Sequence, residues 1–230
     1  MIPPFIVQTA LEHGINLIAI TDHNSSANIE SVQIAARGSG LEVLPGMELQ
    51  TREDIHSLCL FDTLEQINKL QKEVDLTLPS IKNDPDHFGE QFGVDETGEF
   101  IRREERLLIT SSRLSINEAF NIVTELGGLF IPAHINRKTF GLIESLGFIP
   151  PEISFPAVEI SRHLTPEQAK KLYPSIGYTP IIQNGDVHRL SDFLGVLELL
   201  MNEPTMSEIV MALRRANGRS FSIAKPPFLI

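Results

Sequence analysis

The chain has 230 residues, of which 42% are hydrophobic and 21% charged, and its formal net charge is -11. This composition excludes a wholly disordered chain and predicts one domain spanning 1–230. No membrane span is expected, because no run of about 18 uncharged apolar residues occurs, and the acidic charge argues against salt-driven binding of long nucleic acid.

The cysteine content indicates a compartment. Cys59 is the one cysteine of the chain, which excludes an internal disulfide framework and fits a reducing cytosol. The first residues, Met1 to Pro4, lack the basic region of a signal peptide. We therefore expect a cytoplasmic protein.

Helical and strand patterns alternate along the first part of the chain. A helix is expected to end at His13, and the short apolar run 16–20 is typical of a buried strand. Ser25 or Ser26 can cap the next helix, which reaches about Arg37. The elements expected after it are a second strand made of the runs 41–45 and 46–49, a third strand over 54–61 and an amphipathic helix over 64–74.

The pattern breaks between about 76 and 112, where turn residues and a charged stretch predominate. This segment has too few apolar residues for a core of its own, so we interpret it as an irregular insertion on the main fold. Beyond it we expect a helix over 115–126, strands over 129–134, 157–161 and 180–188, a helix over 206–217 and a strand over 219–223. The alternation predicts an α/β protein.

Potential metal ligands fall on or after the predicted strands. In parallel α/β folds the carboxyl ends of the strands form one shared mouth, so residues distant in sequence can meet there. Imidazole and carboxylate ligands suit Zn, Mn or Fe, and two or three such ions can hold a phosphate and generate hydroxide. The candidates are His23, Glu48, His56, His134, Asp186 and His188.

Each candidate also has an ordinary structural interpretation. A single histidine after a strand is more often a structural hydrogen-bonding group than a ligand. Asp186, beside Gly185, could form an Asx turn, and Glu48 could be a cap. Coincidence at so many equivalent positions favours the metal interpretation for the set as a whole.

Other polar residues have less specific signals. Arg137 is either a solvated loop charge or a phosphate clamp, for which its geometry is suited. His163 follows a predicted strand and could touch a substrate, whereas His13 is expected at a helix end and His87 on the surface. Cys59 lies in an apolar strand and is expected to be a core residue rather than a nucleophile.

Five segments together resemble a known family. The segments Ala-Ile-Thr-Asp-His-Asn (19–24), Gly-Met-Glu (46–48), Asp-Ile-His (54–56), Ile-Pro-Ala-His (131–134) and Gly-Asp-Val-His (185–188) resemble, in order, the motifs of the PHP (polymerase and histidinol phosphatase) superfamily. The resemblance covers almost the whole chain. The segment 88–108 is similar to the insertion of stand-alone bacterial PHP proteins.

The resemblance implies a distorted seven-stranded (β/α) barrel of the TIM-like type that holds up to three divalent metals. It also implies hydrolysis of phosphoesters by metal-activated hydroxide. By this resemblance Glu48 would bridge two metals, and Arg137 would face the substrate phosphate. The remaining ligands would be His56 and His134 for the second metal, Asp186 for the first, and His23 with His188 for the third, while Asp22 would orient its neighbours.

The chain departs from the family pattern at its start. The family begins with a strand carrying His-x-His, and this chain has no His-x-His, so we expect a barrel without its first strand. Such a gap would expose backbone edges on neighbouring strands. A start placed too late, a natural truncation and a strand donated by a partner chain are the open explanations. We favour the first, because Pro3 and Pro4 before a helix are typical of an internal position.

The leading hypothesis is a metal-dependent phosphoesterase in which Glu48, Asp186 and Arg137 are catalytic. The expected substrate is a small phosphorylated metabolite or a nucleotide. Two alternatives are a catalytically degenerate PHP-like scaffold, which the missing motif favours, and a metal-dependent amidohydrolase. A barrel gap also makes a homo-oligomer plausible.

Overall fold

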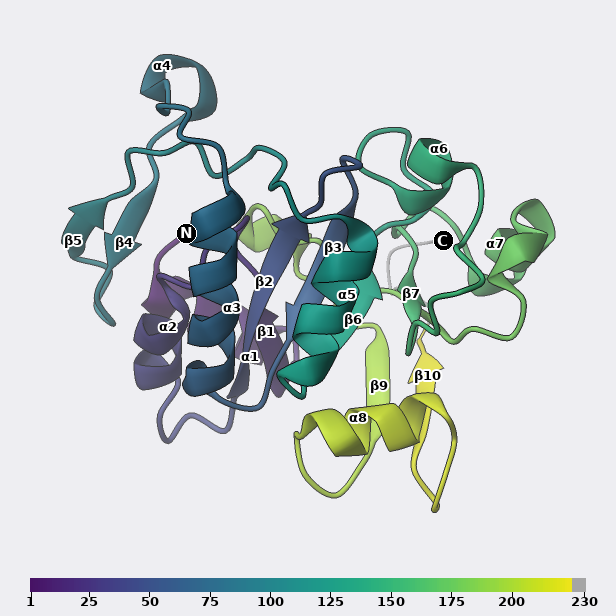
Figure 1. Ribbon diagram of the computed structural model, residues 1–230. Helices are drawn as coiled ribbons and strands as arrows, with labels where there is room; N and C mark the ends of the chain where they lie inside the picture. The colour runs from purple at the N-terminus through teal and green to yellow at the C-terminus, as the bar shows by residue number, and fades with distance from the viewer. Residues whose placement is uncertain (225–230) are drawn as a thin grey trace.

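The computed structural model describes residues 1–224 as a mixed α/β fold (Figure 1). The first part alternates helices and strands as predicted. Its elements are α1 (Pro3–Glu12), β1 (Leu17–Ile20), α2 (Ile29–Ala35), β2 (Glu42–Gln50), β3 (His56–Leu60) and α3 (Leu64–Thr77).

The largest sheet has the order β1-β2-β3-β6, in which β6 spans Leu129–Pro132. β1 and β2 are parallel, whereas β3 runs antiparallel to both β2 and β6. The expectation of a parallel sheet was therefore wrong for β3. The antiparallel direction of β3 still brings predicted ligands together, because the beginning of β3 lies beside the carboxyl ends of β2 and β6.

The long strand β2 joins the parallel part of the sheet to the antiparallel part. Its first half pairs with β1 and its second half, from Gly46 onward, pairs with β3. A side chain at Gly46 would place its Cβ only 2.8 Å from Thr21 Cγ2 and 3.0 Å from the Ile20 oxygen. Glycine therefore permits the end of β1 to approach β2 closely where β2 changes partner.

Helices α3 and α5 (Ile116–Glu125) lie against one face of this sheet (Figure 1). Each begins with a capping box, Thr63 with Gln66 and Ser115 with Glu118, which satisfies free amides of the first turn. Met47, Leu49 and Cys59 are completely buried in the core cluster that includes these helices, as expected for Cys59.

The helix after β1 begins later than predicted. Its N-cap is Asn28 rather than Ser25 or Ser26. The Ser25 hydroxyl instead accepts a bond from the Ala27 amide, and the Ser26 amide bonds to the Gln71 side chain. These side chains stabilise an extended loop that carries His23.

The predicted insertion contains regular structure. Its elements are the helical turn α4 (Pro85–Phe88) and the hairpin of β4 (Phe92–Val94) and β5 (Phe100–Arg103). The hairpin is attached to α2 by a bond from the Ser31 hydroxyl to the Val94 oxygen, and His87 is exposed as expected.

The rest of the described chain consists of short elements. Several were not predicted from the sequence, namely α6, α7, β9 and two 3-10 turns, because segments of three to seven residues carry little periodicity. The elements are α6 (Leu142–Leu146), β7 (Val158–Glu159), α7 (Pro166–Leu172), η1 (Pro174–Ile176), β8 (Ile181–Ile182), η2 (Leu190–Asp192), β9 (Leu197–Leu200), α8 (Met206–Leu213) and β10 (Ser220–Ile223).

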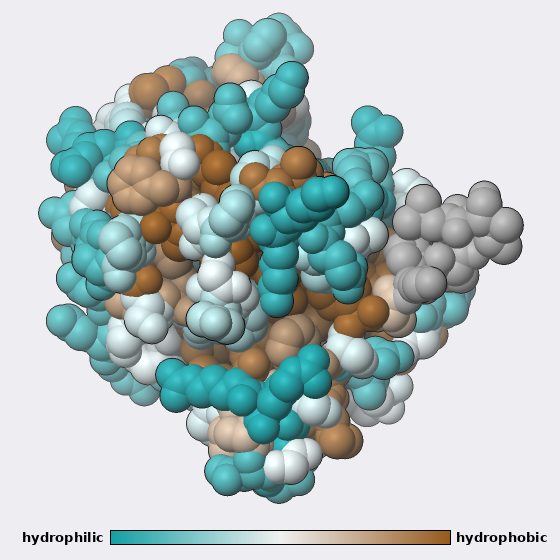
Figure 2. All heavy atoms as spheres, turned by 90° about the vertical axis from the view of Figure 1, so that its right-hand side faces the viewer, coloured by the Kyte–Doolittle hydropathy of each residue, from teal (hydrophilic) through white to brown (hydrophobic). Residues whose placement is uncertain are grey.

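These short strands form two further pairs. β7 and β8 are parallel, and β9 and β10 are antiparallel. Figure 2 shows the face that bears α7 and α8, where hydrophobic surface gathers near the middle between hydrophilic side chains. None of the helices found within residues 1–224 has the length and apolar character that crossing a bilayer requires.

Gly128 provides a test of the packing that leads into β6. A Cβ at this position would lie 2.6 Å from Phe61 Cδ1 and 2.7 Å from the Leu60 oxygen. We expect Gly128→Ala to lower the free energy of unfolding by about 1–3 kcal/mol, because neither the buried ring nor the backbone can easily move. Urea denaturation measures this loss.

Gly93→Ala is the matched control, because the added Cβ would meet only the Arg102 side chain, whose Cγ is 3.0 Å away. That side chain can shift, so the loss should be smaller. Equal losses in the two variants would contradict the packing argument.

Candidate metal centre

The loop after β1 is attached firmly to its surroundings. His23 forms an isolated parallel bridge with Glu48 of β2. The buried Asn24 side chain donates to the oxygens of Leu108 and Thr110 and accepts from the Gln50 amide. These bonds hold His23 against the sheet, so its position is fixed before any ligand binds.

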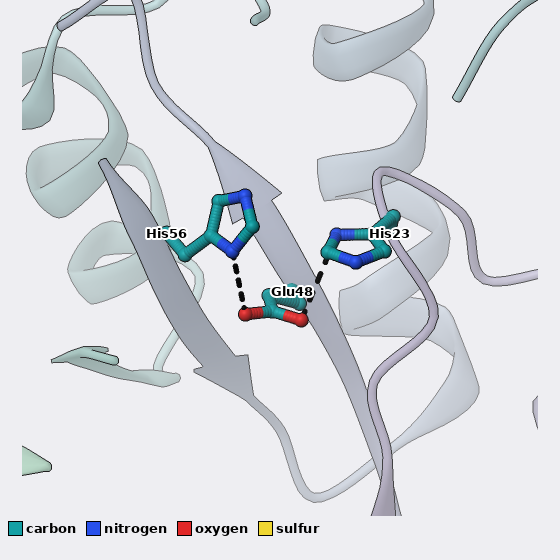
Figure 3. Close-up of side chains that lie close together, drawn as sticks. All are labelled: His23, Glu48 and His56. Atoms are coloured by element: carbon teal, nitrogen blue, oxygen red, sulfur yellow. Dashed lines mark ion pairs between the residues drawn. The ribbon is translucent and has the colours of Figure 1, made fainter. Parts of the chain in front are cut away.

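Glu48 is the centre of the site (Figure 3). Its side chain is buried, and His56 Nδ1 and His134 Nε2 lie 2.9 and 3.1 Å from its Oε1. His23 Nδ1 lies 3.6 Å from Oε2. Three imidazoles therefore surround one carboxylate.

The strand register explains this convergence. His56 pairs with Gln50, two residues beyond Glu48 on β2, so Glu48 and His56 are diagonal neighbours across the pair. The ring of Phe140 stacks on that of His56 with centroids 4.3 Å apart, and the Phe140 oxygen accepts a bond from the His56 amide. The aromatic contact therefore fixes the orientation of the imidazole.

A second group of side chains centres on Asp186, in the loop after β8. His188 Nε2 lies 3.1 Å from Asp186 Oδ1, and Arg137 forms an ion pair with Oδ2. Ligand atoms of Glu48, His134 and Asp186 all lie within 4.8 Å of one another. The two groups are therefore one continuous site, and the structure brings all six predicted ligands and Arg137 together.

The backbone is strained at two of these residues. His134 has φ 30° and Asp186 has φ 48°, in the left-handed region that non-glycine residues seldom adopt. Arg162 donates to the Gly185 oxygen and so supports the loop that holds Asp186. Backbone strain of this kind often accompanies functional sites.

The imidazoles keep Glu48 ionised. Burial alone would raise the pKa of this carboxyl, but the hydrogen bonds with His134 and His56 outweigh burial and hold the pKa well below its usual range. Burial also favours a raised pKa for Asp186, yet the hydrogen bond with His188 and the charge of Arg137 lower it. The site therefore presents two carboxylates.

Burial and hydrogen bonds also shift the pKa values of the neighbouring residues His188, His23 and Asp22. The pKa of His188 is raised by its bond to Asp186, whereas burial lowers the pKa of His23. Burial raises the pKa of Asp22, whose Oδ2 accepts from the Asn28 side chain. A neutral His23 retains a lone pair, as a metal ligand must.

The residues fit divalent metal ions. Two groups have ligand atoms within 4.8 Å of one another, and both mix carboxylate oxygen with imidazole nitrogen. Nδ1 of His23 faces Glu48 Oε2 at 3.6 Å and is buried without a hydrogen-bond partner among the described residues. Buried polar atoms are normally paired, so this nitrogen indicates that a bound cation would complete the site. The groups are His23, Glu48 and His56, and Glu48, His134 and Asp186.

Sequence reasoning missed one carboxyl of this region. Glu159, at the end of β7, is 3% exposed and lines the same cavity as Glu48 and Asp186. Burial first, and then the charges of Glu48 and Asp186, raise the pKa of Glu159 to about 8. A single acid inside the apolar run 157–161 was the signal available. His163, by contrast, is exposed and belongs to neither ligand group.

Sequence comparison gives one short match. No protein-family profile matches the chain. A 5'-3' exoribonuclease of Haemophilus influenzae is 37% identical over 49 residues, which are 21% of this chain and 18% of that protein. The chain thus matches less than a fifth of that curated relative's length.

Structural comparison covers far more of the chain. Endonuclease Q of Pyrococcus furiosus matches with a TM-score of 0.71 and 18% identity, over 96% of this chain and 53% of the endonuclease. A protein of Bifidobacterium adolescentis assigned as a metal-dependent phosphoesterase matches with a TM-score of 0.56 and 18% identity, over 82% of each chain. An amidohydrolase of Chromobacterium violaceum, solved with sulfate and no metal, matches with a TM-score of 0.58 and 15% identity, over 93% and 92%.

At these identities the likeness is one of fold alone, which this chain shares with the endonuclease, the phosphoesterase and the amidohydrolase. The chain spans about half of the endonuclease.

Metal content tests the candidate ligands directly. We expect protein purified without chelator to hold about one to three equivalents of Zn, Mn or Fe by plasma emission spectroscopy. Glu48→Gln should lose at least one equivalent, because Glu48 belongs to both ligand groups. His163→Ala is the control and should retain the full content. Unchanged metal in Glu48→Gln would remove the assignment.

The pH dependence of stability tests Glu159. The unfolded carboxyl ionises near 4.5 and the folded one near 8, so the folded state binds more protons between these values. With metal removed by chelator, stability should therefore fall as the pH rises through this window, on the order of a few kcal/mol. Glu159→Gln should lack this fall in urea denaturation. Parallel pH profiles for the two proteins would contradict the burial argument.

Proposed function

We propose that the chain has the PHP-superfamily fold that its motifs resemble and that it is a metal-dependent phosphoesterase. The observation that carries the proposal is the buried Glu48 carboxylate, which three imidazoles surround and which lies within 4.8 Å of Asp186 and His134 ligand atoms. A carboxylate shared by two ligand groups is suited to bridge two ions.

The proposed assignment of ligands follows these groups. Glu48 would bridge two metals, with His56 and His134 on one of them, Asp186 on the other, and His23 with His188 on a third. Zn, Mn or Fe are the ions that such donors suit. When bound, these ions would supply an activated water and would stabilise charge on the phosphoryl oxygens.

The remaining side chains would position the substrate. Arg137 carries an ion pair to Asp186 and is 43% exposed at its side chain, so its guanidinium is accessible from solvent. We assign it to the substrate phosphate, for which a planar guanidinium offers paired donors. Asp22, hydrogen-bonded by Asn28, would orient the loop that bears His23.

The finer features of the fold are part of the same proposal. We assign the strands to a distorted (β/α)7 barrel in a single domain over 1–230, and we place the protein in the cytoplasm. The order β1-β2-β3-β6 together with the β7-β8 pair supports the barrel.

The substrate class includes nucleotide ends as well as small phosphorylated metabolites. A complex of endonuclease Q with a 27-mer duplex substrate that carries an abasic lesion at the active site matches this chain with a TM-score of 0.70. The Haemophilus relative is named as an exoribonuclease. These names weaken the expectation against long nucleic acid, although the net charge of -11 still favours a chain end over a long duplex.

One alternative activity has a specific observation in its favour. The Chromobacterium amidohydrolase aligns with most of both chains, so hydrolysis of a cyclic amide is the second candidate. The degenerate PHP-like scaffold, which needs no metal, is the remaining candidate.

An activity screen separates these candidates. Metal-loaded protein should hydrolyse phosphate mono- or diesters, such as p-nitrophenyl esters and terminally phosphorylated oligonucleotides, and not cyclic amides. Glu48→Gln should lower the rate at least about 100-fold. Arg137→Ala should lower kcat/KM about 10–100-fold, since a charge-assisted contact is lost, while Arg137→Lys retains part of the activity.

Arg52→Ala is the control for the arginine variants, because Arg52 pairs at the surface with Glu53. Hydrolysis of amides alone would establish the second candidate. Metal-loaded protein without either activity would favour the scaffold.

A further inference from the structure

Two candidate ligands, Asp186 and His188, are carried by the loop between β8 and η2 rather than by a strand. The two ends of this loop approach each other closely, because a Cβ on Gly185 would lie only 2.7 Å from the Asp192 oxygen. Asp186 has φ 48°, and strained backbone of this kind persists only where surrounding contacts impose it. Contacts from outside the loop must therefore hold it in place.

Arg162, just after β7, supplies such contacts to both ends of the loop. Its Nη2 donates to the Gly185 oxygen and, at 3.4 Å, to the Asp192 oxygen, and it lies 3.9 Å from Asp192 Oδ1. The other carboxylate oxygen of Asp192 accepts a bond from the His188 amide at 3.3 Å. One guanidinium is thus connected to the residue before Asp186 and, through Asp192, to the backbone of His188.

The backbone that carries Arg162 is itself fixed by the preceding residue, Ser161. The Ser161 amide donates to Asn136 Oδ1 at 2.8 Å, and Asn136 Nδ2 donates to the Ser161 hydroxyl at 2.9 Å. The Ser161 oxygen accepts a bond from the buried Gln183 side chain. Because Asn136 lies two residues after His134, the end of β7 is connected to both of the loops that carry ligands.

The ligands of the main sheet have a different support. Glu48 and His56 are placed by the register of β2 and β3, and His23 is placed by its bridge with Glu48. Within residues 1–224, the hydrogen bonds and ion pairs of the Arg162 side chain go to the loop after β8 and to none of these three residues. The two parts of the metal centre are therefore held by separate contacts.

We propose that Arg162 is a positioning residue for one part of the metal centre. It holds Asp186 and His188 where they can share ions with Glu48, and it does not position the ligands of the sheet. Arginine has no lone pair to offer, so Arg162 acts through the loop and not as a ligand. This inference rests on the ligand assignment of the proposed function and adds to it a residue outside the ligand set.

Titration calorimetry of the chelator-treated whole chain with Zn²⁺ tests the proposal. Two reference variants, Asp186→Asn and His56→Ala, should each remove a different part of the zinc binding. We expect Arg162→Ala to weaken the part that Asp186→Asn removes by about 10–100-fold, the usual cost of losing a residue that orients a metal ligand. The part that His56→Ala removes should be unchanged.

Arg215→Ala is the matched control. The Arg215 guanidinium also donates to a backbone oxygen, that of Phe221, at 3.1 Å, in a segment that carries no candidate ligand among the described residues. This variant should bind zinc as the parent protein does. Arg162→Lys keeps the charge and a donor but cannot reproduce the fork of a guanidinium, so its loss should fall on the same zinc site and be smaller.

Far-UV circular dichroism establishes that the variants fold, and Arg162→Lys decides the matter if Arg162→Ala does not fold. Zinc binding equal to that of the parent in the folded variant would overturn the inference and leave the proposed function in place. Equal weakening of both parts would mean that Arg162 only stabilises the fold, which would overturn the inference as well. A parent protein that binds no zinc would overturn the proposed function and, with it, this inference.

Discussion

The buried carboxylate of Glu48 is the constraint on which the rest of the site depends. An isolated carboxylate cannot be kept ionised in an apolar interior unless donors or cations compensate it. In this chain His23, His56 and His134 provide that compensation from a loop, a strand and a strand end that are far apart in sequence. The fold can be understood as the scaffold that delivers these three rings to one point. The same interaction makes the site receptive to divalent cations, because imidazoles that stabilise the carboxylate are also good ligands.

The geometry of β2 makes this delivery possible. The strand pairs with β1 before Gly46 and with β3 after it, so Glu48 lies just past the point where the sheet changes from parallel to antiparallel pairing. The loop after β1 and the beginning of β3 consequently reach the same carboxylate from two sides. Phe140 and Asn24 then hold the neighbouring elements, one by stacking on His56 and the other by bonding the loop to β2. Much of the positioning of the candidate ligands therefore comes from hydrogen bonds and aromatic stacking by residues that are not themselves candidate ligands.

Sequence patterns predicted the main elements and the positions at which polar residues interrupt apolar strands. Those interruptions indicated Glu48, His134 and Asp186, because polar groups that recur at equivalent strand positions favour one shared site over several unrelated structural roles. The direction of β3 could not be predicted, since alternation of apolar residues is the same for parallel and antiparallel pairing. Glu159 was missed because one acid in a short strand has no distinguishing pattern. The pairing of Arg137 with Asp186 links residues 49 positions apart and needs the tertiary structure. The cap at Asn28 was missed because two serines nearby satisfy the same sequence preference.

The left-handed backbone at His134 and Asp186 has a consequence for how this chain can change. Glycine adopts such φ values without steric cost, and asparagine tolerates them better than histidine does. Replacing His134 by glycine would relieve local strain while it deletes a candidate ligand. Folding stability and ligand chemistry thus favour different residues at the same position, a trade-off that is common where a site is built on a strained backbone. In a library selected only for abundance in cells, glycine and asparagine should accumulate at these two positions, whereas selection for metal retention should restore histidine and aspartate.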